Sequence, residues 1–179
     1  MHVKIVSQAP LDIVTLDEAK SQCRLMPSFT LDDDRLNLLI QTATQLAQNY
    51  TSKQLSLSQV SMLQRQYSPN IYLFGGEVGE IVSASCYTQN GKVMLTESDY
   101  IFNPITQSVS VNPKYAQCVD FVFDYECGYE TVPAQVKQGI LLLVSTMYNA
   151  TEDYLIGLTH ENLPYTSLAL LNSVRDYHA

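Results

Sequence analysis

Residues 119–144 read VDFVFDYECGYETVPAQVKQGILLLV, and their hydrophobic pattern changes from the period of a strand to that of a helix. Every second residue from Val119 to Tyr125 is large and apolar, which is typical of a strand with one buried face. Apolar residues then recur at three- and four-residue steps after Pro133, a residue that suits the first position of a helix. The stretch therefore predicts a strand that ends at Gly128 and a helix from Pro133 to about Ala150.

The helix after Pro133 is apolar on almost every side. One face carries Val136, Ile140, Leu143, Val144 and Met147, and the apolar surface continues through Leu141, Leu142 and Tyr148. A lone surface helix in a domain of this size rarely needs apolar side chains all round. Two covers are compatible with the pattern: the β region and first long helix of the same chain, or a neighbouring subunit.

Two helices are expected upstream, after an irregular start that ends in Pro10. The segment Thr15-Leu16-Asp17-Glu18 is a capping box, which begins a short helix to about Leu25. Pro27 and Ser28 break this helix, and the acidic segment Asp32 to Asp34 suits the start of a second helix to about Thr51. The second helix carries an apolar stripe formed by Leu36, Ile40, Ala43, Ala47 and Tyr50. The glutamines at positions 41, 45 and 48 are expected on other faces of this helix.

Residues 57–127 consist of short runs of β-forming residues separated by Gly, Pro, Asn and Asp. Within them, Asn90-Gly91 predicts a hairpin between strands 81–87 and 93–95. A linker from Glu152 to Pro164 leads to a short helix, 166–175, that is marginal alone and needs docking.

The predicted fold class is therefore α+β, a small helical bundle with an inserted antiparallel β region. We expect one domain over residues 1–179, with the helical core at 12–55 and 131–151, the β insertion at 57–127, and a C-terminal docking segment at 164–179.

The composition is that of a folded, acidic protein. Hydrophobic residues make up 46% of the 179 residues, and the net charge is -8 with a pI near 4.7. The ten Lys and Arg residues are scattered, which argues against phosphate binding, although an acidic wall would let DNA slide past. The longest apolar run is too short to span a bilayer and no leader pattern is present, so we expect a reducing cytoplasm and free thiols.

A search for catalytic and metal-binding patterns gives no candidate. The histidines, at positions 2, 160 and 178, lie near the termini or in the linker, and the cysteines, at positions 23, 86, 118 and 127, lack C-x-x-C spacing. The segment Gly75 to Gly79 lacks the Lys-Ser or Lys-Thr of a phosphate loop, so we expect a turn. We interpret Asp32 to Asp34 as a helix start, and Asp120 with Asp124 as a solvated sheet face. The sequence predicts no enzyme, cofactor or metal.

Taken in order, several segments resemble the tailed-bacteriophage head-tail connector family, also called head-completion adaptor or DNA-packaging proteins. The similar segments are 14–20, 32–36, 38–43, 51–55, 79–87, the hairpin at 90–91, 99–100, 125–129, 132–144 and 148–149. This chain departs from the family pattern at Ser52, where Gly is common, and at Gly139, where Ala is usual. The linker after Asn149 also lacks a basic residue that is often found there.

The resemblance implies a structural virion neck protein, a dodecameric ring beneath the portal that serves head completion, DNA retention and tail attachment. Its implied partners are further copies of itself, the portal protein and a downstream stopper or tail-completion protein. DNA would pass through the ring without sequence-specific binding, and no membrane is involved. The implied location is the virion neck, after synthesis in the bacterial host cytoplasm.

Cyclic assembly requires two different complementary patches on each chain. We therefore expect Leu141, Leu142 and Tyr148 at the subunit contact. The C-terminal stretch resembles the segment that docks on the portal, and its expected docking residues are Leu168, Leu171, Arg175 and Tyr177.

Three alternatives remain open from the sequence. Another neck ring protein, a stopper or tail terminator, would be richer in β structure. A small cytoplasmic enzyme would need a pocket with perturbed titrating groups. A monomeric binding module would keep the mass of one subunit at all concentrations.

Overall fold

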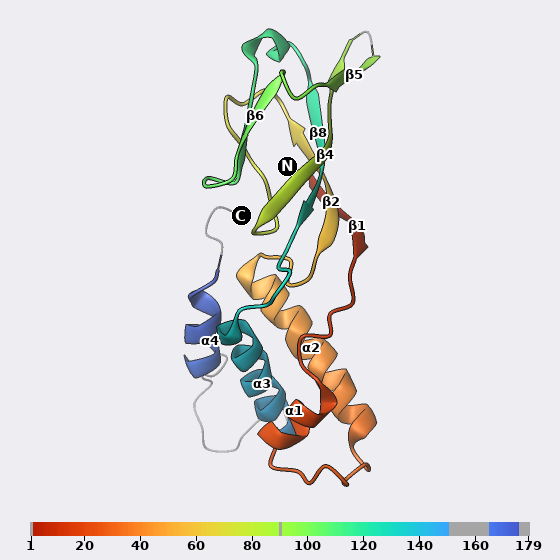
Figure 1. The fold of residues 1–179 in the computed structure, drawn as a ribbon, viewed down its shortest axis with the longest axis vertical. Helices are drawn as coiled ribbons and strands as arrows, with labels where there is room; N and C mark the ends of the chain where they lie inside the picture. The colour runs from red at the N-terminus through yellow and green to blue at the C-terminus, as the bar shows by residue number, and fades with distance from the viewer. Residues whose placement is uncertain (1, 90, 151–164, 176–179) are drawn as a thin grey trace. The chain divides into compact units, whose positions relative to one another are not determined.

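The computed structural model describes residues 2–89, 91–150 and 165–175, which form a mixed α+β structure with four α-helices and antiparallel sheets (Figure 1). This confirms the predicted α+β class. The chain divides into two compact units. The described part of the β unit comprises residues 2–10, 52–89 and 91–130, and that of the helical unit comprises 11–51, 131–150 and 165–175. The expectation of a single domain with an insertion stays a prediction.

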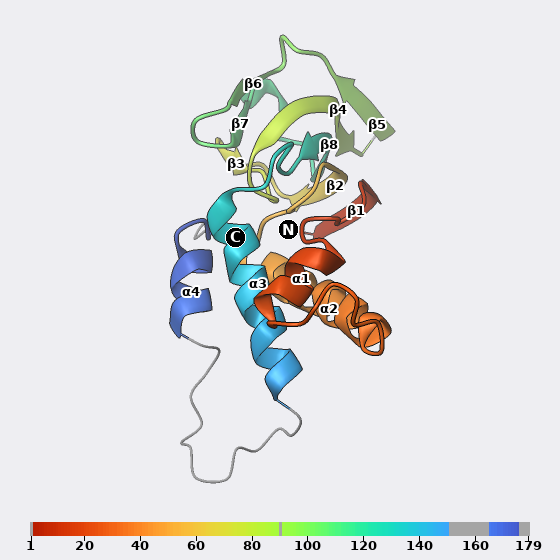
Figure 2. The ribbon, with the colours of Figure 1, turned by 60° about the horizontal axis from the view of Figure 1, so that its bottom comes forward.

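The helical unit contains α1 (Leu16–Gln22), α2 (Asp33–Thr51), α3 (Ala134–Asn149) and α4 (Tyr165–Asn172). Figure 2 shows α3 between α4 on one side and the pair α1 and α2 on the other, and α3 contacts all three. The predicted capping box is confirmed, because the Glu18 amide donates to Thr15 Oγ1 at 3.3 Å and the Thr15 amide donates to Glu18 Oε2 at 3.0 Å. Pro133 lies one residue before α3 as its N-cap residue, not at its first helical position.

The apolar stripe of α2 is buried at Leu36, Ile40, Ala43 and Ala47, while Tyr50 is half-buried. Gln48 is also buried, contrary to the expectation that it faces elsewhere. The buried face is wider than a narrow stripe because α2 packs against more than one neighbouring helix.

The β unit contains two antiparallel sheets where the sequence predicted one β region. The larger has the order β1-β2-β8-β4-β5 and the smaller the order β3-β7-β6. Their bounds are β1 His2–Gln8, β2 Ser58–Arg65, β3 Ile71–Tyr72, β4 Val78–Thr88, β5 Gly91–Leu95, β6 Tyr100–Asn103, β7 Ser108–Val111 and β8 Asp120–Cys127, with a 3-10 turn η1 at Pro113–Tyr115. The predicted hairpin is confirmed, since β4 pairs with β5 from Ala84↔Leu95 to Thr88↔Gly91.

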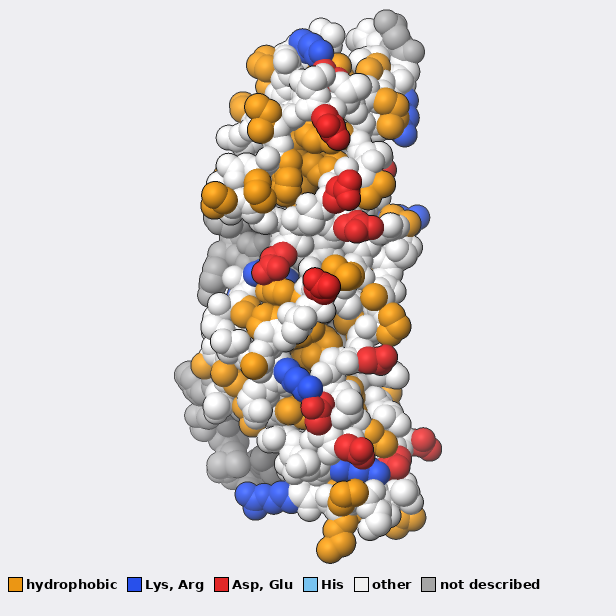
Figure 3. Space-filling view, viewed as in Figure 1, with side chains coloured by type: hydrophobic (Ala, Val, Ile, Leu, Met, Phe, Trp, Pro, Cys, Tyr) orange, Lys and Arg blue, Asp and Glu red, His pale blue; other side chains and the backbone are white. Residues whose placement is uncertain are grey.

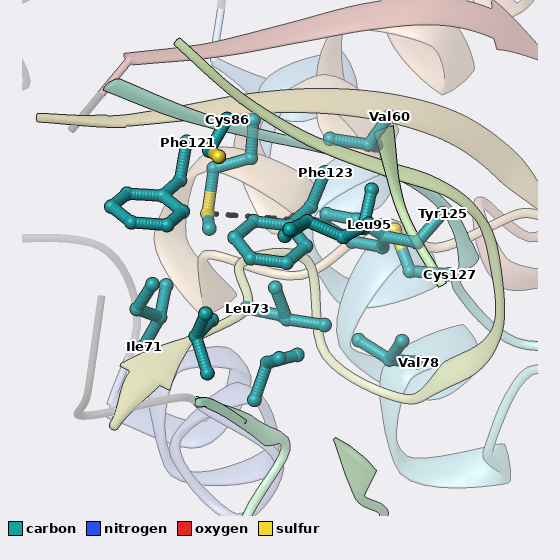
Figure 4. Close-up of a cluster of buried hydrophobic side chains, with 14 of the residues drawn as sticks. Val60, Ile71, Leu73, Val78, Cys86, Leu95, Phe121, Phe123, Tyr125 and Cys127 are labelled. Carbon is teal, nitrogen blue, oxygen red and sulfur yellow. Dashed lines mark hydrogen bonds between the residues drawn. The ribbon is translucent and has the colours of Figure 1, made fainter. Parts of the chain in front are cut away.

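Strand β8 lies between β2 and β4 and buries alternate side chains, among them Phe121, Phe123 and Tyr125 (Figure 4). The Tyr125 hydroxyl donates to the Phe74 carbonyl at 2.7 Å and accepts from the Phe74 amide at 3.0 Å, which compensates for its burial. The strand ends at Cys127, one residue before the expected end. The next residue, Gly128, has a left-handed φ of +109°, and a Cβ there would overlap the Ser56 carbonyl. The core of the β unit is therefore organised around β8.

Two expectations about strands are wrong. The start of the chain is not irregular, because His2–Gln8 forms the edge strand β1 and pairs with β2. Most β1 side chains are exposed, so the strand has no alternating hydrophobic pattern that the sequence could reveal. The alternation of β8 begins at Phe121, because Val119 precedes the strand and is 57% exposed.

Candidate functional site

Tyr148, expected at a subunit contact, takes part in a network that joins the end of α3 to the start of α2. Its hydroxyl donates to Asp32 Oδ2 at 2.6 Å, and this hydrogen bond is the main cause that raises the pKa of Tyr148. The Arg35 guanidinium lies 5.0 Å from the Tyr148 ring centroid and donates to the Tyr148 carbonyl at 3.1 Å. Arg35 thus satisfies a carbonyl in the last turn of α3, where a cation also suits the helix dipole.

Leu141 and Leu142 are half-buried on α3, between residues that are buried. Ile140, Leu143 and Val144 supply the core contacts of this helix. Part of the apolar surface of α3 is therefore accessible in the isolated chain. The assignment of Leu141 and Leu142 to a subunit contact stays a prediction.

Helix α4 packs closely on α3 at Gly139. Leu171 is only 1% exposed, and a Cβ at Gly139 would lie 3.2 Å from both Leu171 Cγ and Cδ2. The Tyr50 hydroxyl on α2 donates to Asn172 Oδ1 at 2.7 Å, and the Arg175 guanidinium lies 4.9 Å from the Tyr50 ring centroid. Glycine at position 139 permits the close approach of α3 and α4.

The four residues expected to dock on the portal differ in their surroundings. Leu171 is a packing residue of the helical unit, Leu168 is half-buried and Arg175 is exposed. Tyr177 lies outside the described residues. A surface formed by Leu168 and Arg175 needs no movement of α4, whereas exposure of Leu171 requires α4 to leave α3.

A groove of about 700 Å³ lies in the helical unit between the segment before α1 and one face of α2. The described residues that line it carry the carboxyl group of Asp12 and several side-chain amides and hydroxyls, and none of them is His, Cys or Lys. These groups can form hydrogen bonds, but they provide no nucleophile with an adjacent base. The sequence did not reveal this groove because it depends on how residues 11–16 run along α2. The lining residues are Leu11, Asp12, Val14, Thr15, Leu16, Asn37, Ile40, Gln41, Thr44 and Gln45.

Among the described residues, three lysines are paired with carboxylates. Lys20, whose side chain is only 4% exposed, places its Nζ 2.6 Å from Asp33 Oδ1. Lys137 Nζ lies 2.6 Å from Glu18 Oε1, and Lys114 Nζ lies 2.6 Å from Asp99 Oδ1. The hydrogen bonds from Lys137 and Lys114 are the main causes that lower the pKa of Glu18 and of Asp99 respectively. Within each unit, the basic side chains on the face shown in Figure 3 lie apart from one another. The paired lysines therefore do not contribute to a basic patch.

Among the described residues, no group of three or more His, Cys, Asp or Glu side chains could hold a metal ion. Nor does any described helix have the length and apolar character to cross a membrane. His2 is exposed on β1, and His160 and His178 lie outside the described residues.

All four cysteines have free thiols, and the fold brings two of them together. The Cys86 and Cys118 sulfurs lie 2.8 Å apart, although the two residues are 32 positions apart in the sequence and form no C-x-x-C pair. Burial raises the pKa of Cys86 and of Cys127 to about 12, so both thiols are protonated near neutral pH. A protonated thiol is a poor nucleophile.

Comparison with known proteins gives a family match and a fold match. The family model described as "Phage gp6-like head-tail connector protein" matches residues 13–76, which confirms the resemblance over that part of the chain. No curated protein matches this sequence.

Similar solved structures come from gene transfer agent particles. One is the neck of the empty particle computed with C6 symmetry, with a TM-score of 0.73, 16% identity, and coverage of 98% of this chain and 95% of the other. A second is the virion of the native particle, with a TM-score of 0.72 and 15% identity. A third is the neck of the native particle computed with C12 symmetry, with a TM-score of 0.71 and 14% identity. Each match again covers 98% of this chain and 95% of the other. At these identities the likeness shows the fold, so the chain shares its fold with chains of these particles and matches the gp6-like head-tail connector family over residues 13–76.

Proposed function

We propose that this chain is a structural neck protein, a head-tail connector that forms a ring beneath the portal and has no enzymatic activity. The observation that carries the proposal is the family match over residues 13–76, which includes α1 and α2. The shared fold supports it, because the alignment to a chain of a particle neck extends over 98% of this chain. The family match favours a connector over a stopper or tail terminator.

The proposed ring is a dodecamer of identical chains in contact head to tail. Such a cyclic contact needs two different patches on each subunit. Leu141 and Leu142 are the proposed centre of one patch, because each is half-buried beside a packed core. Tyr148 would contribute through the end of α3, where Asp32 and Arg35 hold it in place.

The proposed partners on either side of the ring are the portal protein and a downstream stopper or tail-completion protein. Leu168, Leu171, Arg175 and Tyr177 are the proposed portal-docking residues. The acidic net charge of -8 supports passage of DNA through the ring without binding, because like charges repel. The proposed location is the virion neck, after synthesis in the host cytoplasm.

The ring is tested by native mass spectrometry of the chain alone and mixed with its portal protein. We expect twelve copies on the portal, because the portal supplies the template for assembly. Leu142→Glu should abolish the ring, since a charge in an apolar contact loses its hydration. The matched control is Leu38→Glu at an exposed leucine of α2, which should leave the ring intact. A mixture that contains only single subunits and free portal would contradict the proposal.

Portal docking is tested by two truncations in a pull-down. Removal of everything after Pro164 should leave a folded chain that no longer binds the portal. Removal of everything after Asn172 retains α4 and its contact with Gly139, but deletes Arg175 and Tyr177. Loss of binding in both variants would assign docking to the final segment, and loss in the first alone would assign it to α4. Undiminished binding by the first truncation would contradict the proposed docking site.

A further inference from the structure

Cys86 and Cys118 lie side by side in the β unit. Cys86 belongs to β4 and Cys118 follows η1, and their sulfur atoms are 2.8 Å apart. The residues that follow them are joined by a main-chain hydrogen bond, in which the Val119 amide donates to the Tyr87 carbonyl at 2.9 Å. The backbone beside both cysteines is therefore held in place.

The two sulfurs are part of the hydrophobic core of the β unit. Cys86 is 0% and Cys118 4% exposed, and Figure 4 shows Cys86 beside Phe121 in the buried cluster. Among the described residues, no third potential ligand completes a metal-binding group around the pair. A standard disulfide has a bond of about 2.05 Å, so the sulfurs would have to approach by less than about 1 Å. The geometry is that of a reduced pair close to bonding distance.

We propose that Cys86 and Cys118 are a disulfide-forming pair, which a small-molecule disulfide such as oxidised glutathione converts into an intramolecular cross-link. One cysteine thiolate attacks a sulfur of oxidised glutathione, which forms a mixed disulfide and releases one glutathione thiol. The second cysteine then attacks the protein sulfur of the mixed disulfide and releases the other glutathione thiol. Two protein thiols are oxidised, oxidised glutathione is reduced, and both protons end on glutathione.

The surroundings of the pair determine when this reaction takes place. Exchange requires a thiolate, and burial keeps the Cys86 thiol protonated, so the reaction waits for local opening of the β unit. A cytoplasm keeps such thiols reduced, whereas the surroundings of a released particle are oxidising. This biological setting rests on the proposed neck function, but the chemistry of the pair does not.

The cross-link would stabilise the β unit. It closes a loop from β4 to the start of β8 that contains β5, β6, β7 and η1. Closure of a loop of this size limits the freedom of the unfolded chain, and the expected rise in Tm is about 6–12 °C.

The test is to equilibrate the full-length protein with oxidised glutathione, denature it, and alkylate the remaining thiols with N-ethylmaleimide. Trypsin cuts after Lys92 and Lys114, so a link between Cys86 and Cys118 joins two separate peptides. The second peptide also contains Cys127, and the experiment is therefore repeated with Cys127→Ala. We expect both chains to lose two thiols as one Cys86 to Cys118 cross-link, with the corresponding rise in Tm.

Cys86→Ala is the matched control, since it retains the buried thiols of Cys118 and Cys127 but removes the close pair. This variant should form no cross-link between them and show no rise in Tm. Retention of alkylatable Cys86 and Cys118 in the Cys127→Ala chain would overturn the proposal, as would a cross-link that involves Cys23. The assay uses the chain alone, so failure of ring assembly leaves its outcome unchanged.

Discussion

Ser52, the residue after α2, has a φ angle of 57°, in the left-handed region of backbone space. An L-residue with a Cβ adopts this region at a cost of roughly 1–2 kcal/mol, whereas glycine adopts it freely. Position 52 is also one where the head-tail connector family, which this chain resembles, commonly has glycine. The reason is physical, because a left-handed residue ends many helices and satisfies their last carbonyls.

We expect Ser52→Gly to raise the free energy of unfolding by about 0.5–1 kcal/mol, since relief of backbone strain exceeds the added freedom of the unfolded chain. Urea unfolding followed by circular dichroism measures the change. The control is Ser61→Gly in β2, which should lower stability by about 0.5–1 kcal/mol because a strand interior gains nothing from glycine. A Ser52→Gly chain less stable than the parent would contradict the strain argument.

Asp99 gives the chain a stability term that depends on pH. Its carboxylate accepts hydrogen bonds from Lys114 at 2.6 Å, and from the Thr96 amide at 2.9 Å and hydroxyl at 2.7 Å. These contacts, with Lys114 the largest, hold the pKa of Asp99 below its ordinary value of 3.8. Because the folded pKa is the lower one, this stabilisation is present above the unfolded pKa and is lost as pH falls through the folded pKa.

Asp99→Asn should therefore flatten the acid side of the stability profile. Carboxyl groups titrate between about pH 5 and about pH 2. Over this range, the free energy of unfolding of the parent should fall more steeply than that of the variant. Lys114→Met retains the carboxyl group but removes its main partner, and its profile should lie between the two. Parallel profiles for the parent and Asp99→Asn would show that Asp99 makes no such contribution.

At the scale of elements, α4 depends on its contact with α3. A helix as short as Tyr165–Asn172 is marginal in water and needs tertiary packing. Leu171 against Gly139 and the Tyr50 to Asn172 hydrogen bond provide that packing. The glycine is unfavourable for α3 itself by about 1 kcal/mol relative to alanine. The structure gives a reason for glycine at position 139, because a larger side chain would contact Leu171 of α4.

Gly139→Val should displace α4 and lower the free energy of unfolding by about 1–3 kcal/mol, because extra methyl groups overpack the contact with Leu171. Hydrogen exchange of the α4 amides measures the displacement, and we expect their protection to be lost while that of α2 persists. Gly139→Ala is the control. Its gain in helix propensity opposes a contact at 3.2 Å, so its net effect should be small. Full protection of α4 in Gly139→Val would disprove the close packing.

At the scale of the whole molecule, charge limits what the chain can bind. There are eighteen acidic and ten basic residues, and Lys20, Lys114 and Lys137 are already paired with carboxylates. Binding to duplex DNA requires clustered cations that release counterions. The net charge of -8 favours repulsion of DNA, which is what the proposed passage of DNA through a ring requires.

We expect no binding of the free chain to duplex DNA at physiological salt, even at about 100 μM protein, the weak end of ordinary non-specific affinity. Fluorescence anisotropy of a labelled duplex measures this, with a basic DNA-binding protein as positive control. Binding that weakens steeply with added salt would contradict the expectation, because that dependence is the signature of phosphate contacts.

By itself, the sequence determined the features that depend on neighbours along the chain. The capping box at Thr15, the buried stripe of α2, the hairpin of β4 and β5 and the alternation of β8 all follow from local spacing. Each is visible because the period of a helix or strand repeats within a few residues. The segments within residues 13–76 that resemble the family could also be recognised from the sequence, because they follow one another in the expected order along the chain.

Only the tertiary structure decided the features that join distant residues. Strand β1 is held by pairing with β2 and not by its own pattern, and the β region separates into two sheets. The Cys86 and Cys118 thiols meet, and Leu171 fills the space left by Gly139. Such contacts depend on how the chain closes its long loops, and hydrophobic periodicity carries no information about that closure. For this reason the helix after Pro133 could be predicted from spacing, whereas the partners of its residues could not.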